Sequence, residues 1–267
     1  MTRVLSGAFL IALAVGTVWF APPLVFKAVA FVLLCAAAVE LVGLASASGL
    51  SIPMWPSVTG AAITLAVLAF PASANGRETT PLQVVLLAQF VALSGVILGG
   101  WNGGSDGLAR VSASLFPSIY LAMPLGALVA LREHEGPAVL FLLMLTVMVS
   151  DIAQYYTGRV LGRRPLAPII SPGKTVEGAL GGLVFGALVL AIVGTWWLPR
   201  VPIALRALMG VTIVALGITG DLFESMLKRS AGVKDSSALI PGHGGVLDRI
   251  DALLFAAPVY YIVLQYI

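Results

Sequence analysis

Charge is scarce in this chain of 267 residues, of which only 10% are Asp, Glu, Lys or Arg while 59% are hydrophobic. A mean hydropathy of +1.03 excludes an ordinary water-soluble domain. Long polar stretches are lacking too, and no soluble domain of ~50 residues fits between the apolar runs. The chain is therefore predicted to lie in a lipid bilayer.

Cysteine and histidine are also rare, with one Cys and two His. The lone Cys35 excludes an intramolecular disulfide and a cysteine-ligated metal cluster, and its apolar neighbours predict a small buried side chain. The formal net charge of +3 does not call for a nucleic acid as partner. Basic loops that face the cytoplasm explain it better in a multi-pass membrane protein.

Apolar runs long enough to cross a bilayer as helices recur along the whole chain. They predict an all-α fold, a polytopic integral membrane helical bundle of about nine transmembrane helices. The runs are 4–20, 23–45, 56–71, 82–99, 113–131, 137–158, 176–198, 202–227 and 247–266. The first run lacks a clear signal-peptide cleavage site, so we interpret it as a membrane helix.

Lys and Arg are distributed unevenly across such a bundle. With nine spans and a cytoplasmic N-terminus, ten basic residues fall on the cytoplasmic side and five on the other. This asymmetry follows the positive-inside rule. The two most basic loops, about 159–175 and 228–246, fall on the same side, so we expect them to build one site there.

The polar residues concentrate in the stretch 225–251, which reads SMLKRSAGVKDSSALIPGHGGVLDRID. Its glycines let the backbone approach a ligand and expose N–H groups to anions. Carboxylates flank this basic, glycine-rich loop, a pattern that suits a metal ion and a polyphosphate bound together. The apolar run that leads into this stretch ends with four polar residues that share one helical face: Asp221, Glu224, Ser225 and Lys228.

A second polar cluster covers residues 150–182. A polar stripe on one predicted helix is formed by Asp151, Gln154, Tyr155 and Gly158. Because Asp151 lies in a membrane span, it should face the bundle interior. Ser171 followed by Pro172 is typical of a helix start, and a helix N-terminus near Lys174 would be a natural phosphate site.

Two further features lie within apolar runs. Glu40 is an intramembrane acid, which marks either a functional residue or a hydrogen bond between helices. Gly178, Gly182 and Gly186 recur every four residues and predict a helix-packing face. Such glycine faces would also permit a homodimer.

Both polar clusters resemble the motifs of the phosphatidate cytidylyltransferases (CDP-diacylglycerol synthases). The matching residues of the C-terminal cluster are Ser225, Lys228, Arg229, Lys234, Asp235, His243, Gly244, Gly245, Asp248, Arg249 and Asp251. Those of the other cluster are Ser150, Asp151, Gly158, Arg159, Ser171, Pro172, Lys174, Thr175, Glu177, Gly178, Gly181 and Gly182. The resemblance covers about residues 150–251, and the N-terminal helices share only hydrophobicity with the family.

The resemblance implies that CTP and phosphatidic acid are the substrates and that CDP-diacylglycerol and pyrophosphate are the products. Residues 1–135 would be N-terminal transmembrane helices, and 136–267 would be the catalytic region, with its site on the cytoplasmic face of the inner (plasma) membrane. The expected catalytic residues are Asp151, Asp221, Glu224, Lys228 and Asp248. The expected substrate-binding residues are Ser171, Lys174, Thr175, Glu177, Ser225, Arg229, Lys234, His243, Gly244, Gly245 and Arg249.

Carboxylate oxygens suit Mg²⁺, alone or with a second cation. We expect Asp221, Asp248 and Asp251 to hold it. No general base is required, because a phosphate monoester has a second pKa near ~6 and is already largely ionised at neutral pH. His243 is therefore expected to bind phosphate or to hold the loop.

Two alternatives stay open. A cytidylyltransferase or kinase that acts on an isoprenoid lipid would use similar phosphate chemistry, and apolar helices carry no readable code for the lipid. A multi-pass transporter would also place charges within its spans, but it should show an internal repeat of broken helices. We find no such repeat in this sequence.

Overall fold

The structure, a computed structural model, describes residues 2–71, 73–74, 77–78, 81–240, 242 and 244–267. His243 of the predicted site lies outside the described residues. The described chain is mainly helical, which confirms the all-α prediction. Its helices are α1 (Thr2–Phe20), α2 (Pro23–Ala47), α3 (Met54–Ala69), α4 (Leu82–Gly99), α5 (Gly107–Pro117), η1 (Ser118–Ala122), α6 (Met123–Ala130), η2 (Leu131–Glu135), α7 (Pro137–Leu161), α8 (Val176–Trp197), α9 (Ile203–Ser230) and α10 (Leu247–Gln265).

Six helical segments are long and apolar enough to cross a membrane: α2, α4, the continuous run from α5 to η2, α7, α8 and α9. The predicted count of about nine spans is therefore not confirmed. Among the remaining helices, α3 has only 16 residues. The predicted last span, α10, begins with Asp248, Arg249 and Asp251, which shorten its apolar part.

The run from α5 to η2 contains two π-helical turns, η1 and η2. Pro117 ends α5 just before η1, and Pro124 lies at the start of α6. Proline has no N–H to donate and its ring crowds the preceding turn, so a regular i→i−4 ladder cannot continue through it.

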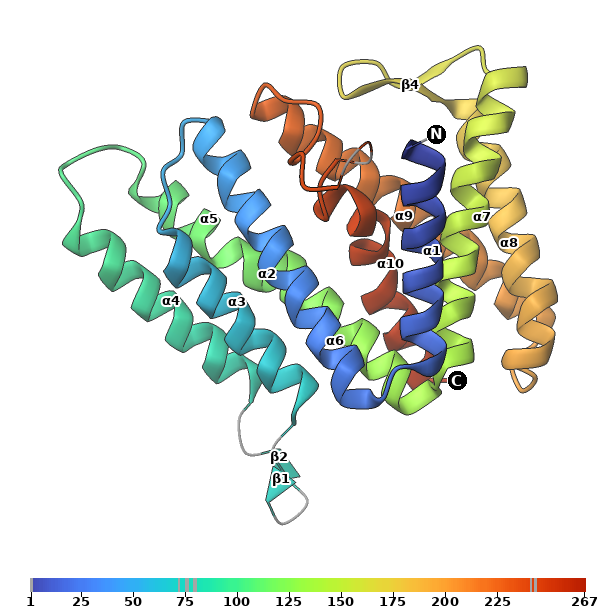
Figure 1. The fold of residues 1–267 in the computed structure, drawn as a ribbon, viewed down its shortest axis with the longest axis horizontal. Coiled ribbons are helices and arrows are strands. Elements are labelled where there is room, and N and C mark those ends of the chain that lie inside the picture. The colour runs from blue at the N-terminus through green and yellow to red at the C-terminus, as the bar shows by residue number, and fades with distance from the viewer. Residues whose placement is uncertain (1, 72, 75–76, 79–80, 241, 243) are drawn as a thin grey trace.

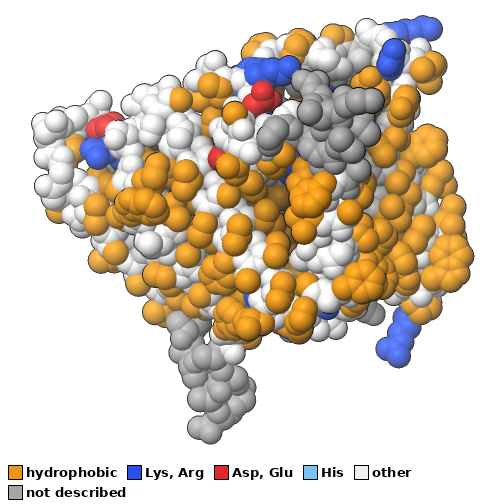
Figure 2. Space-filling view, viewed as in Figure 1, with side chains coloured by type: hydrophobic (Ala, Val, Ile, Leu, Met, Phe, Trp, Pro, Cys, Tyr) orange, Lys and Arg blue, Asp and Glu red, His pale blue; other side chains and the backbone are white. Residues whose placement is uncertain are grey.

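α10 lies between α2 and α6 on one side and α7 and α8 on the other (Figure 1). One hydrophobic cluster combines α2, α3 and α6 with the first half of α10. A second cluster combines α7, α8 and α9 with the rest of α10. The division of the chain at residue 135 stays a prediction, and α10 contributes to both clusters. Hydrophobic side chains cover the middle of the visible face, whereas most charged side chains of that view lie near its upper edge (Figure 2).

The predicted glycine face of α8 is confirmed as a packing face. Gly178, Gly182 and Gly186 are all buried. A Cβ at position 182 would lie 2.5 Å from Cγ of Gln154 on α7, and one at position 186 would lie 2.2 Å from Val214 on α9. Small residues thus bring three helices close together. Because this face is used within the chain, it does not supply a homodimer interface.

Short antiparallel hairpins join two pairs of helices. β1 (Ser73–Ala74) and β2 (Arg77–Glu78) lie between α3 and α4, and β3 (Pro165–Ala167) and β4 (Ser171–Thr175) lie between α7 and α8.

The prediction that Ser171 begins a helix is wrong, because residues 171–175 pair with β3. The helix starts at Val176, where Thr175 is the N-cap and its Oγ1 accepts the N–H of Gly178 at 3.1 Å. The predicted phosphate site at a helix start therefore shifts to the first turn of α8.

Candidate active site

One cavity of about 590 Å³ opens where the β3–β4 hairpin meets the connection between α9 and α10. Its lining residues are Asp151, Gln154, Tyr155, Gly158, Arg159, Ser171, Gly173, Lys174, Thr175, Gly178, Ala179, Asp221, Ser225, Lys228, Arg229, Lys234, Asp235, Asp248, Arg249 and Asp251. The two basic loops predicted to share one side of the bundle do lie together here. Most of the predicted site residues line this cavity.

The hairpin and α9 are joined across the cavity by an ion pair between Lys174 and Asp221. Asp221 Oδ1 also accepts a long hydrogen bond of 3.4 Å from Ser225, one turn further along α9. On α7, Asp151 accepts a hydrogen bond from Gln154 at 3.0 Å. The polar stripe of α7 and Asp221 of α9 line the same cavity.

Lys228 lies between two acids. Its Nζ is 2.5 Å from Oδ1 of Asp248, and it also forms an ion pair with Glu224 one turn earlier on α9. Glu224 is fully buried, and the Asp248 side chain is only 6% exposed. In such a buried group each charge depends on the others, because removal of one partner leaves an uncompensated charge.

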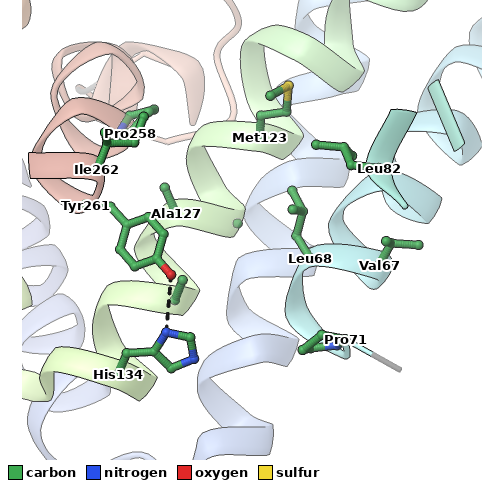
Figure 3. A pocket seen from close by; sticks show the side chains of 12 residues that line it. Val67, Leu68, Pro71, Leu82, Met123, Ala127, His134, Pro258, Tyr261 and Ile262 are labelled. Carbon is green, nitrogen blue, oxygen red and sulfur yellow. Dashed lines mark hydrogen bonds between the residues drawn. The ribbon is translucent and has the colours of Figure 1, made fainter. Parts of the chain in front are cut away.

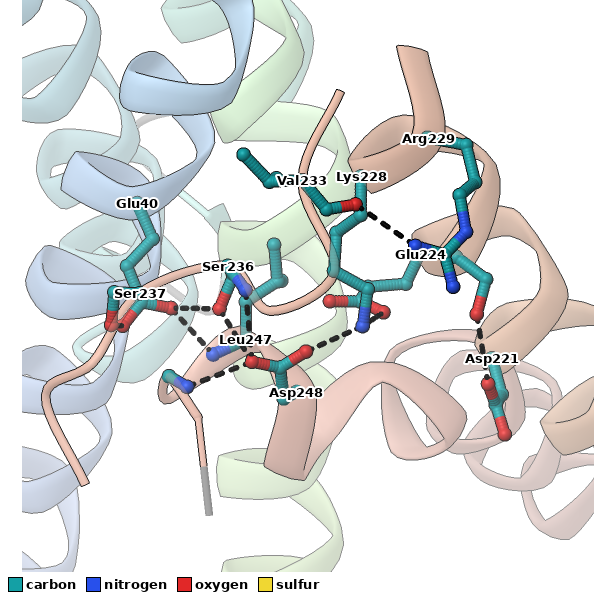
Figure 4. Close-up of polar contacts among 12 residues, drawn as sticks. Glu40, Asp221, Glu224, Lys228, Arg229, Val233, Ser236, Ser237, Leu247 and Asp248 are labelled. Carbon is teal, nitrogen blue, oxygen red and sulfur yellow. Dashed lines mark hydrogen bonds and ion pairs between the residues drawn. The ribbon is translucent and has the colours of Figure 1, made fainter. Parts of the chain in front are cut away.

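Asp248 is further held by three donors on its other oxygen (Figure 4). Oδ2 accepts the backbone N–H of Gly245 at 2.7 Å, the N–H of Ser236 at 3.0 Å and the Ser236 hydroxyl at 2.9 Å. Its Oδ1 atom accepts only from Lys228 among the described residues and keeps a lone pair for another partner. The role of Asp248 as a metal ligand therefore stays a prediction.

Four further acids line the cavity: Asp151 on α7, Asp221 on α9, Asp235 in the connection after α9 and Asp251 on α10. The negative charges of Asp221 and Asp151 repel that of Asp251. Within the described ranges, no three acidic or histidine side chains are close enough to hold an ion by themselves. The protein thus offers carboxylates that could supply part of a coordination shell.

Four cations of the cavity form no ion pair with any residue that the structure describes: Arg229, which donates to two backbone carbonyls, and Arg159, Lys234 and Arg249. The last three project from α7, from the connection after α9 and from α10. Together with Lys174 and Lys228 they make the cavity suited to an anion with several negative charges.

The comparison with known proteins decides the family. The cytidylyltransferase family profile matches residues 1–267, which is the whole chain. This chain belongs to the cytidylyltransferase family. A phosphatidate cytidylyltransferase of Mycobacterium bovis is 32% identical over 274 residues, which cover 98% of this chain and 89% of the relative.

Other alignments of this cytidylyltransferase family member are shorter. A phosphatidate cytidylyltransferase of Synechocystis is 50% identical over 131 residues, or 48% of this chain and 44% of the relative. One of Haemophilus influenzae is 46% identical over 132 residues, or 48% of this chain and 46% of the relative. These two alignments span about half the length of each relative.

Some residues predicted to bind substrate also have partners within the protein. Glu177 accepts the N–H groups of Arg163 and Arg164 at 3.0 and 3.2 Å and so holds the approach to the hairpin. Arg229 donates to the carbonyls of Ile170 and Val233, although it also borders the cavity.

Gly244 and Gly245 were predicted to offer backbone donors to phosphate; for Gly244 this stays a prediction, whereas the N–H of Gly245 has a partner within the protein. The N–H of Gly245 is donated to Asp248. Gly244 has a φ of 77°, and a Cβ there would lie 2.5 Å from Oδ2 of Asp248. Both glycines therefore allow the backbone to turn tightly around this carboxylate.

A residue outside the predicted set of site residues also connects to this cavity. Glu40 of α2 is buried and accepts hydrogen bonds from the connection before α10 and from the start of α10. Its position as an acid inside an apolar run was the signal for it. Ser236, which links it to Asp248, carried no signal because serine is common in polar loops.

A second cavity, of about 310 Å³, is mainly apolar and lies near the other end of α10 (Figure 3). Leu68, Met123 and Ile262 are among its lining residues. The Nδ1 atom of His134 lies 3.2 Å from the hydroxyl of Tyr261 at its edge. None of its described lining residues is Asp, Glu, Lys or Arg, so this cavity is poorly suited to a nucleotide triphosphate.

Proposed function

We propose that this protein transfers a cytidylyl group from CTP to phosphatidic acid. A phosphate oxygen of the lipid attacks the α-phosphorus of CTP. The bond from that phosphorus to the bridging oxygen of the β-phosphate breaks, so that CDP-diacylglycerol and pyrophosphate form. The observation that carries the proposal is the convergence of cations from α7, β4, α9 and α10 on one cavity in a membrane chain of the cytidylyltransferase family.

Arg159, Lys234 and Arg249, which form no ion pair with described residues, suit the triphosphate, and Lys174 and Lys228 would supply further positive charge near it. Positioning and electrostatic stabilisation are the main requirements of such a transfer at phosphorus. The lipid phosphate is already largely ionised at neutral pH because its second pKa is near ~6, so no side chain needs to remove a proton.

We further propose that the site uses Mg²⁺. When bound, the ion would neutralise triphosphate oxygens and polarise the α-phosphorus. Asp221, Asp248 and Asp251 fit as its ligands, because all three are carboxylates that line the cavity. Oxygen atoms of the triphosphate would complete the coordination shell.

The orientation is also a proposal. The cavity is built from the loops that carry the excess of Lys and Arg, and such loops face the cytoplasm in multi-pass proteins. CTP is available on that side of the inner membrane, and the lipid phosphate can enter from the bilayer surface.

The test uses the purified protein in detergent with CTP labelled at the α-phosphate, Mg²⁺ and one lipid at a time. Phosphatidic acid should yield a labelled CDP-lipid together with pyrophosphate. An isoprenoid phosphate and an isoprenoid alcohol form the comparison arms. If label enters only an isoprenoid product, or if no lipid accepts it, the proposed reaction is wrong.

A further inference from the structure

Glu40 is a buried carboxylate, 7% exposed, on a helix that contributes no residue to the lining of the large cavity. It nevertheless accepts four hydrogen bonds from the region that builds the site (Figure 4). The donors are the hydroxyls of Ser236 (2.9 Å) and Ser237 (2.7 Å) and the N–H groups of Val246 (2.9 Å) and Leu247 (2.8 Å).

The two backbone donors belong to the start of α10. The N-cap residue of this helix is Val246, whose side chain cannot accept a hydrogen bond. Glu40 supplies the missing acceptors from another helix, and its negative charge lies at the positive end of the α10 dipole. The position of the α10 N-terminus is therefore set by α2.

The hydroxyl donor Ser236 connects Glu40 to the site. Its Oγ lies 2.9 Å from Oε2 of Glu40 and 2.9 Å from Oδ2 of Asp248. A hydroxyl has one proton, so the two carboxylates share this donor. Asp248 in turn holds Lys228 through its other oxygen. The contacts form a continuous relay from α2 to the cation of the cavity.

Gly245 is required for this close approach. A Cβ at that position would lie 2.1 Å from Oγ of Ser236 and 2.5 Å from each oxygen of Glu40. The backbone that precedes α10 is thus shaped to fit the Glu40 carboxylate.

We propose that Glu40 is a positioning residue for the transfer reaction. It fixes the start of α10, and through Ser236 it fixes Asp248, so that Lys228 and Arg249 keep their places at the cavity. This inference rests on the proposed function, because it concerns the same site. Glu40 itself contacts none of the cations.

The test compares Glu40→Gln with a matched control, Gln89→Leu. Gln89 is equally buried at 7% and donates to Gly60 O and Thr64 Oγ1, and none of these three residues lines the cavity. For each variant we would measure kcat, KM for CTP and thermal unfolding in the same detergent.

Glu40→Gln places an amide N–H against existing donors and should lower kcat about 100-fold through misplacement of the site. Its KM for CTP should rise by no more than about tenfold, because Arg249 and Lys228 lose their places while Arg159 and Lys174 lie on other elements. Gln89→Leu should lower the unfolding temperature at least as much and keep kcat within about threefold of the wild type.

Two further variants examine the relay. Ser237→Ala removes one of the four donors and should retain most activity. Ser236→Ala should lower kcat, and combining it with Glu40→Gln should add less than the sum of the two effects on the free energy of activation, because both act through Asp248. Full additivity would contradict the relay.

A readout without substrate separates this inference from the proposed function. Lys234 is exposed, so trypsin can test how firmly the connection before α10 is held. Cleavage after Lys234 should be about tenfold faster in Glu40→Gln than in Gln89→Leu, because local opening becomes easier. Unchanged cleavage, or a kcat in Glu40→Gln that matches Gln89→Leu, would overturn the inference. If the wild type forms no CDP-lipid but the cleavage difference appears, only the proposed function fails.

Discussion

Replacement of Lys174 by alanine is the sharpest test of the cavity as a nucleotide site. Lys174 is 24% exposed at its side chain, pairs with Asp221 and faces the same space as the unpaired cations. Loss of a hydrogen bond to a charged group costs about 1.5–3 kcal/mol, which corresponds to about a 10- to 150-fold fall in kcat/KM for CTP. The variant also removes the cation beside Asp221, so the repulsion that Asp221 shares with Asp251 would add to the loss.

The assay follows pyrophosphate release against CTP concentration at saturating lipid. The matched control is Lys27→Ala, which breaks another lysine–acid pair, with Glu133 at 2.7 Å, outside the cavity. Lys27→Ala should leave kcat/KM for CTP near the wild-type value. Equal kinetics in wild type and Lys174→Ala, with both variants folded, would refute the assignment of this cavity to CTP.

The remaining predictions concern the metal, the buried ion pair and the orientation. Excess EDTA should abolish CDP-lipid formation and added Mg²⁺ should restore it, whereas Asp221→Asn should stay nearly inactive at high Mg²⁺; activity unchanged in EDTA would contradict the metal proposal. Asp248→Asn should lose turnover and should unfold more easily by roughly 3–5 kcal/mol, because it breaks a buried pair with Lys228; a wild-type thermal transition would count against that reason. In a Cys35→Ala background, Ile169→Cys on the hairpin, 91% exposed in the wild type, should resist impermeant thiol reagents in intact cells while Arg200→Cys reacts; the reverse labelling pattern would contradict a cytoplasmic site.

Local helical spacing predicted much of the fold and much of the cavity. Asp221, Ser225 and Lys228 were placed on one helical face, and the structure shows all three lining one cavity on α9. Apolar runs predicted the bounds of α7 and α9 to within a few residues. Helix periodicity and hydropathy depend on residues close together in the sequence, so they can be recognised without knowledge of tertiary contacts.

The errors arose where tertiary contacts decide. Ser171 and Pro172 are typical of a helix start, but the backbone of Ser171 pairs with β3 as part of a strand. Cys35 was expected to be buried, yet it lies on the exposed side of α2, because an apolar side chain in a membrane helix can face lipid as readily as protein. The hydrogen bonds of Glu40 join residues about two hundred positions apart. Patterns of neighbouring residues cannot predict contacts between such distant segments.

The glycine contacts of α8 have a consequence for how the site responds to ionic strength. Gly178, Gly182 and Gly186 set the spacing between α7, α8 and α9 by steric contact, and Gly220 sets that between α9 and α10, where a Cβ would lie 2.6 Å from the carbonyl oxygen of Asp251. Steric contacts are not screened by salt, whereas the attraction between exposed cations and a triphosphate is. Raising the salt concentration should therefore weaken nucleotide capture while the helices keep the same distances, so that inhibition by salt is reversed completely on dilution.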